Sequence, residues 1–182
     1  MLIVNLNPFP ELTTERLRLR QILLEDENDF FALRSNPEIM RFIPRPIART
    51  VADAAQLILN INNGIRQNEH ITWGISQKSD PKIIGTIGYV RMAKQHYRAE
   101  VGYLLSNDYR GKGIMQEALQ AVIDYGFQVM KLHSIEGVID PANTTSARVL
   151  ERAGFMKEAH FKENQFYNDC FHDTVHYSLL AP

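Results

Sequence analysis

The sequence predicts an α/β (α+β) domain in which a mixed sheet of about seven strands packs against about four helices. The first observation is size: 182 residues, 45% of them hydrophobic, suffice for one buried core and are short for two. The second is a succession of strand-like and helix-like segments in the order β-α-α-β-β-β-α-β-α-β-β. The third is the lack of repeats, low-complexity tracts and linkers. We therefore expect a single domain that spans residues 1–182.

The first third of the chain predicts one strand and two helices. Residues 14–22 (TERLRLRQI) alternate polar and apolar side chains, as a half-buried strand does. Residues 23–35 (LLEDENDFFALRS) place acidic residues in a first helical turn, and the Asn-Pro pair at 36–37 ends that helix. Residues 49–65 (RTVADAAQLILNINNGI) carry apolar residues at helical spacing, with Thr50 as the N-cap.

Three strand candidates follow, at residues 70–77 (HITWGISQ), 82–92 (KIIGTIGYVRM) and 97–106 (YRAEVGYLLS). The residues between the first two, KSDP, favour a turn, so these strands are expected to form a hairpin.

The last third predicts two more helices and two or three strands. A helix follows the Arg-Gly-Lys-Gly turn, and residues 132–140 (LHSIEGVID) form a short apolar run typical of a strand. Residues 143–155 (NTTSARVLERAGF) predict a helix with Asn143 as N-cap and Gly154 as a left-handed C-terminal cap. The tail holds a polar loop and a strand that ends near Leu180.

The composition excludes several classes of function. The chain carries 20 basic and 21 acidic residues, so nothing indicates binding to nucleic acid or to an anionic membrane. No apolar stretch approaches the roughly 20 residues of a membrane-spanning helix, and the initial apolar run is too short for a signal peptide. A lone cysteine, Cys170, excludes an internal disulfide framework and is typical of a reducing compartment. We expect a cytoplasmic protein with no membrane or nucleic-acid partner.

A compact turn at residues 110–113 joins the strand ending near Leu105 directly to an amphipathic helix. Glycines at 111 and 113 let a ligand approach the backbone, while the helix N-terminus, Arg110 and Lys112 supply positive charge, which together suit a phosphate group. The alternative is a simple strand-to-helix turn with a solvated basic pair. The Walker pattern is missing, and Gln116 occupies the third glycine position of a dinucleotide fingerprint.

Residues Arg110-Gly111-Lys112-Gly113-Ile114-Met115 resemble the [RQ]-x-x-G-x-[GA] acyl-CoA loop of the GNAT N-acetyltransferases, with Met115 in place of the usual Gly or Ala. A second family motif follows at the expected spacing: an Asn-led helix that ends in Gly-Phe, here Asn143, Ser146, Gly154 and Phe155. The segments LTTERLRLRQ, NPEIMRFI, AEVGYLL and HDTVHYSLL are similar to the Rim-type group, which is named for acetyltransferases of ribosomal-protein N-termini. The resemblance covers nearly the whole chain.

This resemblance implies the GNAT fold, with a mostly antiparallel central sheet and one splayed pair of strands. It also implies acetyl-CoA as co-substrate, with its pantetheine lying between the strands EVGYLL and SIEGVI like an extra strand. A backbone N–H near Leu104 would then act as an oxyanion donor. The expected cofactor-binding residues are Leu104, Leu105, Arg110, Gly111, Lys112, Gly113, Ile114, Met115, Asn143 and Ser146.

Glu100 is the candidate general base. It lies in a predicted central strand, where a carboxylate is costly, and by alternation it shares a face with Gly102 and Leu104. Burial there would raise its pKa toward the range useful for a base acting through a water molecule. The alternative is a strand carboxylate that is paired with Arg91 or Arg98.

Two further acid–base candidates lie beyond Glu100. Glu136, in the partner strand, is the second candidate base and is expected to be more solvated. Many family members have a tyrosine seven residues after the Asn, where this chain has Leu150. The Rim-type resemblance offers Ser146 as the replacement acid, with Asn143 bonded to pantetheine or to water. Alternatively, Ser146 is simply a first-turn residue that satisfies the helix backbone.

The resemblance implies direct transfer to a primary amine, either the α-amine of a peptide or protein N-terminus or the amine of a small molecule. An α-amine with a pKa near ~8 is about one-tenth neutral at pH 7, far more than a lysine, so a modest base suffices for it. A metal site is not expected, since His172 and His176 on one strand would lie ~13 Å apart, and Cys170 is expected to be an inert free thiol.

The alternative function is a non-catalytic CoA-binding sensor or partner-binding module. Dimers are common in the family, but no feature of this sequence indicates one.

Overall fold

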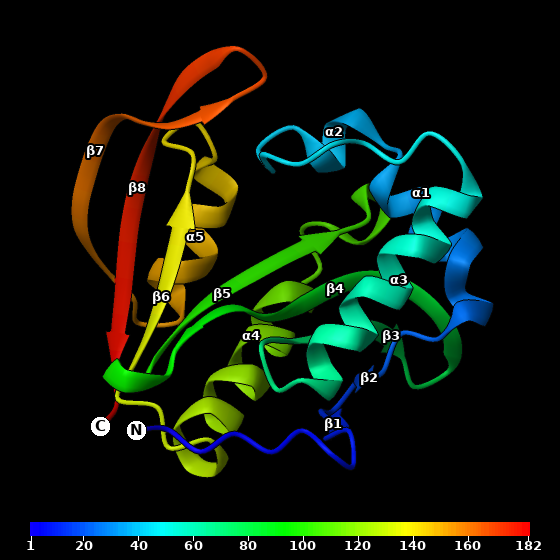
Figure 1. Cartoon of the computed structure of the whole chain (residues 1–182), viewed down its shortest axis with the longest axis horizontal. Coiled ribbons are helices and arrows are strands. Elements are labelled where there is room, and N and C mark those ends of the chain that lie inside the picture. Colours follow the sequence, from blue (N-terminus) through cyan, green and yellow to red (C-terminus); the bar gives the residue numbers. More distant parts are fainter.

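A computed structural model describes all residues, 1–182, and contains one eight-stranded sheet in the order β1-β2-β3-β4-β5-β6-β8-β7 (Figure 1). Every neighbouring pair is antiparallel except β5 and β6, which run parallel. The predicted mostly antiparallel mixed sheet is therefore confirmed. The strands are β1 (Leu12–Thr13), β2 (Leu17–Arg20), β3 (Ile71–Gln77), β4 (Asp80–Ala93), β5 (Arg98–Leu105), β6 (Ser134–Ile139), β7 (Met156–Tyr167) and β8 (Cys170–Leu180).

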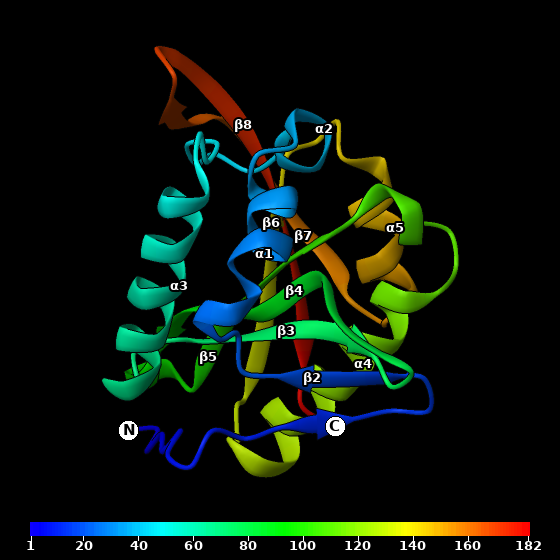
Figure 2. The same cartoon turned by 90° about the vertical axis from the view of Figure 1, so that its right-hand side faces the viewer.

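The helices cover both faces of the sheet. Figure 2 shows α1 and α3 on one side, with α4 on the other. No helix has both the length and the apolar character that crossing a membrane requires. The α-helices are α1 (Glu27–Arg34), α2 (Pro37–Met40), α3 (Val51–Arg66), α4 (Ile114–Asp124), which continues into a π-helical turn at Tyr125–Val129, and α5 (Thr144–Arg152).

The structure has one strand more than predicted because the first strand is divided. The segment expected as one strand over residues 14–22 contains only β2, and the preceding Leu12–Thr13 forms β1. A tight turn separates them: Thr14 N–H donates to the Leu17 carbonyl, and Leu17 N–H donates to Thr14 Oγ1, each at 3.0 Å. The alternation itself is real, since Leu17 and Leu19 are fully buried. The additional short helix α2 is likewise a local feature that the periodicity did not reveal. In addition, residues 161–166 of the tail, expected to lie in a polar loop, belong to the long strand β7, which pairs with β8.

The predicted helix ends are confirmed. Thr50 caps α3 by accepting a hydrogen bond from Asp53 N–H at 3.2 Å, and the Asp53 carboxylate accepts from Thr50 N–H at 2.9 Å. Asn143 Oδ1 accepts from Ser146 N–H at 3.1 Å and caps α5. Gly154 has φ +90°, the left-handed conformation that favours glycine after a helix. The hairpin of β3 and β4 also forms as predicted.

The two faces of the sheet are packed differently. On the α4 face, 28 buried residues form one continuous cluster, which includes Trp73 stacked edge-on against Tyr125 at 5.4 Å between ring centroids. On the α1 and α3 face, the buried side chains fall into two small clusters of five and four residues. A cavity of about 750 Å³ borders both small clusters, since Phe30 of one and Leu104 of the other line it.

Candidate active site

Strands β5 and β6 pair only over their first residues and then separate. The parallel register joins Arg98 to Ser134, Ala99 to Ile135 and Glu100 to Glu136, and no pair follows. Figure 1 shows the two strands diverging from this point like the arms of a V. The expected splayed pair is therefore present, and Glu100 lies at its apex.

The register of β4 and β5 determines which backbone groups face the gap. Ser106 N–H donates to the Ile84 carbonyl of β4 at 2.9 Å, and the pairing continues regularly with Leu105 opposite Gly85 and Leu104 opposite Thr86. Because backbone N–H groups alternate in direction along a strand, Leu104 N–H points toward β4, whereas those of Tyr103 and Leu105 point toward β6. An N–H near Leu104 that points into the gap therefore belongs to Tyr103 or Leu105, and not to Leu104 itself.

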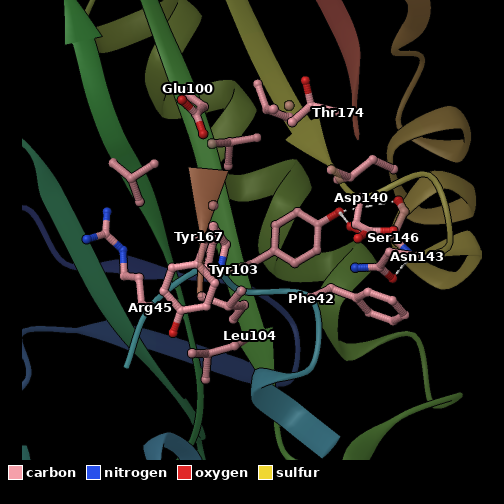
Figure 3. A pocket seen from close by; sticks show the side chains of 18 of the residues that line it. Phe42, Arg45, Glu100, Tyr103, Leu104, Asp140, Asn143, Ser146, Tyr167 and Thr174 are labelled. Atoms are coloured by element: carbon pink, nitrogen blue, oxygen red, sulfur yellow. Dashed lines mark hydrogen bonds between the residues drawn. The ribbon is translucent and has the colours of Figure 1, made fainter. Parts of the chain in front are cut away.

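A cavity of about 750 Å³ opens over the gap and extends under α1, α3 and the tip of the β7–β8 hairpin (Figure 3). Four of the expected catalytic or cofactor-binding residues line it, two from β5 and two from the start of α5, about forty residues later in the chain. The turn at 110–113 lies outside this cavity. The four residues are Glu100, Leu104, Asn143 and Ser146.

The Glu100 side chain is 16% exposed and forms an ion pair with Arg91 at 3.3 Å. Burial raises the pKa of this carboxyl group, the Arg91 charge opposes that rise, and the neighbouring Glu136 adds to it. Arg91 itself is 71% exposed, so water screens the ion pair. Both readings of Glu100 hold in part: it is paired with Arg91, and it is also a half-buried carboxylate on the cavity wall.

Glu136 is less solvated than the sequence suggested. Its side chain is 21% exposed and accepts a hydrogen bond from His176 Nδ1 at 2.7 Å, with Arg98 at 3.8 Å. The other ring nitrogen of His176 lies 3.1 Å from Thr174 Oγ1. His176 comes from β8 and Arg98 from β5, the two strands that flank β6, and together they engage both oxygens of Glu136. Glu136 is also absent from the cavity lining, so it is the weaker candidate base.

Ser146 reaches across the gap to β5. Its hydroxyl lies 2.7 Å from the Tyr103 hydroxyl, while its backbone N–H is bound by Asn143. Figure 3 shows the Tyr103 ring pointing toward Ser146, with Asn143 beside it. Burial raises the pKa of Tyr103 to about 12, so the phenol remains protonated at neutral pH. Ser146 therefore does more than satisfy the helix backbone.

Leu150, where the family tyrosine is expected, is fully buried. It packs over Gly137 of β6, where an added Cβ would lie 2.9 Å from a Leu150 methyl carbon. Leu150 thus places an apolar side chain on the cavity wall, which is also lined by Tyr103 and Ser146, whose hydroxyls are 2.7 Å apart. Sequence reasoning missed Tyr103, which follows Glu100 by three residues but becomes notable only through its contact with Ser146.

The turn that precedes α4 has the backbone shape that its glycines predict. Gly111 and Gly113 both have φ +74°, and Gly113 is the N-cap of α4. No atom lies within 4 Å of where a Cβ would stand on Gly111, so the surface here is open. Arg110 and Lys112 are exposed, and the Lys112 ammonium lies 5.4 Å from the ring centroid of Tyr109. The free N–H groups of the first helical turn face this open surface.

Ile114 and Met115 differ in role from the four residues before them. Both side chains are buried, 3% and 7% exposed, within the large cluster on the α4 face. Only their backbone N–H groups are available to a ligand at the turn. Met115 in place of Gly or Ala therefore alters the packing beneath the turn and leaves its outer surface unchanged.

The match to known families decides what this arrangement is. Residues 16–156 match the family described as Acetyltransferase (GNAT) domain, which is well over half of the chain. The chain belongs to the GNAT acetyltransferases. Membership makes it an N-acetyltransferase with acetyl-CoA as co-substrate.

The relatives of this GNAT domain include ribosomal-protein N-acetyltransferases. YoaA of Bacillus subtilis (strain 168), described as an uncharacterized N-acetyltransferase, is 33% identical over 96% of this chain and 98% of its own length. The ribosomal-protein-S5-alanine acetyltransferase of Vibrio fischeri is 27% identical, with a TM-score of 0.81 over 94% of this chain and 96% of that one. RimL, solved in complex with coenzyme A, shares the fold at a TM-score of 0.85 and 16% identity, over 94% and 98% of the two chains.

Arg16, which contacts the turn at residues 110–113, was not singled out from the sequence. Arg16 Nη1 donates to the Lys112 carbonyl at 3.0 Å, and its Nε forms an ion pair with Glu117 at 2.6 Å. Another of its nitrogens would lie 3.5 Å from a Cβ on Gly113. Arg16 therefore adds a positioned cation at the turn. It precedes Lys112 by 96 residues, and no local pattern links the two.

Proposed function

We propose that this enzyme transfers the acetyl group of acetyl-CoA directly to a primary amine, in a complex that holds both substrates at once. The α-amine of a peptide or protein and the amine of a small molecule are the two acceptor classes. The observation that carries the proposal is the position of Glu100: a carboxyl group with a raised pKa lies at the apex of the gap between β5 and β6 and lines the cavity.

Acetyl-CoA would bind at two places, the turn that precedes α4 and the gap between β5 and β6. Arg110, Gly111, Lys112 and Gly113, with the backbone N–H groups of Ile114 and Met115, would hold the pyrophosphate at the N-terminus of α4. The pantetheine would extend between β5 and β6 and take the backbone hydrogen bonds that the separated strands do not make with each other.

The chemistry is then a single acyl transfer. Glu100 would accept a proton from the acceptor ammonium, directly or through one water molecule, and the neutral nitrogen would attack the thioester carbonyl. The N–H groups of Tyr103 and Leu105, which point into the gap, are the candidate donors to the developing oxyanion. The new C–N bond forms, the C–S bond breaks, CoA leaves as thiolate, and the nitrogen loses its second proton to water, which leaves the neutral amide.

Ser146 and Tyr103 are the proposed proton source for the departing thiolate. Their hydroxyls are 2.7 Å apart, so a proton given by one can be replaced from the other. Asn143 would support this end of the cavity, since its Oδ1 caps α5 and its amide nitrogen remains available to the pantetheine. The pair would take the place of the tyrosine that Leu150 replaces.

A peptide α-amine is the first acceptor class to test. Its lower pKa makes it easier to deprotonate than lysine, and Vibrio fischeri ribosomal-protein-S5-alanine acetyltransferase is among the relatives. We place the reaction in the cytoplasm, which agrees with the one free, exposed cysteine of the chain.

The deciding experiment combines binding and turnover. Calorimetric titration with acetyl-CoA, with ATP and NAD as controls, should show saturable binding of acetyl-CoA alone. A screen of N-terminal peptides, polyamines and aminoglycosides should then yield at least one acetylated product by mass spectrometry. Tight CoA binding with no transfer to any amine would instead indicate a CoA-binding module, and no binding by a folded sample would reject the proposal.

A further inference from the structure

Arg34 is a buried arginine without a partner on the wall of the cavity. It lies in the last turn of α1, is 8% exposed, and lines the cavity. Its Nε is fully buried and has no hydrogen-bond partner, and its guanidinium takes part in no ion pair and no cation–π contact. An unpaired buried charge costs free energy, so this side chain calls for an explanation.

The charges around Arg34 increase this cost. Arg45, in the segment between α2 and α3, lines the same cavity and lowers the pKa of Arg34, in addition to the larger lowering caused by burial. Guanidinium groups remain protonated even so, and Arg41 and Arg91 line the cavity as well, so four arginines face it, of which Arg91 is paired with Glu100. Tyr167, from the tip of the β7–β8 hairpin, lines the same cavity and acts in the opposite direction, raising the pKa of Arg34.

The carboxylates of the cavity do not neutralise Arg34. Glu100 is paired with Arg91 at 3.3 Å, and Asp173 is bound to His160 at 2.7 Å. The third, Asp140, accepts a backbone N–H two residues further on at 2.7 Å. None of them forms an ion pair with Arg34. The positive charge at this end of the cavity is thus uncompensated by the protein.

We propose that Arg34, with Arg45 beside it, binds an anionic group of the acceptor, a carboxylate carried on the same molecule as the reacting amine. The planar guanidinium fork matches a carboxylate, which can accept two parallel N–H bonds. The phosphates of the co-substrate are assigned to the turn at 110–113, which lies outside this cavity. Arg34 comes from α1, on the opposite side of the cavity from Asn143 and Ser146 of α5, which fits the acceptor half.

This inference rests on the proposed function, and it narrows the acceptor to an amino acid or to a peptide with an acidic residue next to its N-terminus. The test uses pairs of acceptors that carry either a carboxylate or its amide, and kcat/KM is expressed per concentration of neutral amine because the carboxylate also raises the pKa of the amine. One series comprises glycine, β-alanine and 4-aminobutyrate against their amides. The other compares seryl-aspartyl amide with seryl-asparaginyl amide. The two series distinguish a free amino acid from a peptide.

We expect kcat/KM to favour the carboxylate in at least one pair by about ten- to hundred-fold, the range for a hydrogen bond to a charged group. Arg34→Met should abolish this preference, and Arg34→Lys, which keeps the charge and loses the fork, should retain part of it. Arg66→Gln is the matched control, because Arg66 is exposed and does not line the cavity. A preference that is missing in every pair, or that survives Arg34→Met, overturns the proposal.

The readout is the ratio of kcat/KM for the carboxylate to kcat/KM for the amide, measured with the same variant, so a general loss of activity cancels. Thermal unfolding of each variant checks that it folds. Replacing an unpaired buried charge with an apolar side chain of similar size should not lower stability. A second arm needs no turnover. The unfolding temperature of the CoA complex should rise with N-acetylglycine more than with N-acetylglycinamide, and only when Arg34 is present. Failure of all transfer with this difference intact would reject the function alone, whereas equal effects of the two compounds would reject the anion site.

Discussion

The two faces of the central sheet differ in how completely they are packed. Under α4 the buried side chains form one cluster of 28 residues, while under α1 and α3 they form clusters of five and four, both of which border the cavity. Glu100 and Arg34, both of which are costly to bury, lie on the α1 and α3 side. We call the α4 side the closed face and the α1 and α3 side the open face. Variants on the closed face should change the free energy of unfolding, whereas variants on the open face should change kcat.

The largest effect is expected for Glu100→Gln on the open face. If Glu100 is the base, kcat should fall by about 10²- to 10⁴-fold. Stability near pH 7 should not decrease, because the raised pKa means that the ionised carboxylate is disfavoured in the folded state and the amide removes that cost. Kinetics, calorimetry with CoA and thermal unfolding test this together. A variant that loses CoA affinity or unfolds early would break the comparison.

On the closed face, Leu119→Ala should show the opposite pattern. Leu119 of α4 is fully buried, so its truncation should lower the free energy of unfolding by about 2–5 kcal/mol through lost burial and a new cavity. Denaturant unfolding measures this, and kcat of the folded fraction at 25 °C should remain close to that of the parent. If kcat fell while the unfolding midpoint stayed the same, the two faces would be coupled.

Tyr103→Phe examines the boundary between the two faces, since the ring packs against the large cluster and the hydroxyl reaches Ser146. We expect kcat to fall about ten-fold, less than for most general acids, because CoA thiolate is a good leaving group. KM for acetyl-CoA should change little. Ser146→Ala should produce a similar loss, and a double variant that is no worse than either single one would show that the two hydroxyls act as a unit. Unchanged kcat in both single variants would remove this pair from the mechanism.

The smallest effect is expected for Arg91→Gln. Arg91 lowers the pKa of Glu100, so its removal should raise that pKa and shift the acid limb of the kcat/KM profile to higher pH. The shift should be small and should diminish further in high salt, because the Arg91 side chain is 71% exposed. A shift toward lower pH would show that the acid limb reports a different group.

Features that depend on a few consecutive residues could be predicted from the sequence. The glycine turn, the Asn143 cap and the placement of Glu100 on the cavity face all follow from local conformation or from strand alternation. The segments that carry the family resemblance include these residues, so the local patterns and the resemblance predict the same features. The division of the first strand was missed because the turn at Thr14 contains neither glycine nor proline.

The remaining site features depend on contacts between distant segments. Arg16 reaches the turn across 96 residues, and His176 of β8 engages Glu136 across 40. The direction of the Leu104 N–H requires the register of β4 against β5, which periodicity does not define. Arg34 resembles any helical arginine in the sequence, and only its burial without a partner makes it notable.

The separation of β5 and β6 also affects how readily the protein aggregates. It leaves two strand edges with unmade backbone hydrogen bonds in the interior of a sheet, and such edges are templates for pairing with other chains. On the proposed mode of binding, the pantetheine shields them, and at 100 times its dissociation constant a ligand stabilises the fold by about 2.7 kcal/mol. Bound acetyl-CoA would then protect the enzyme from aggregation. Depletion of CoA would both slow acetylation and promote aggregation of the enzyme.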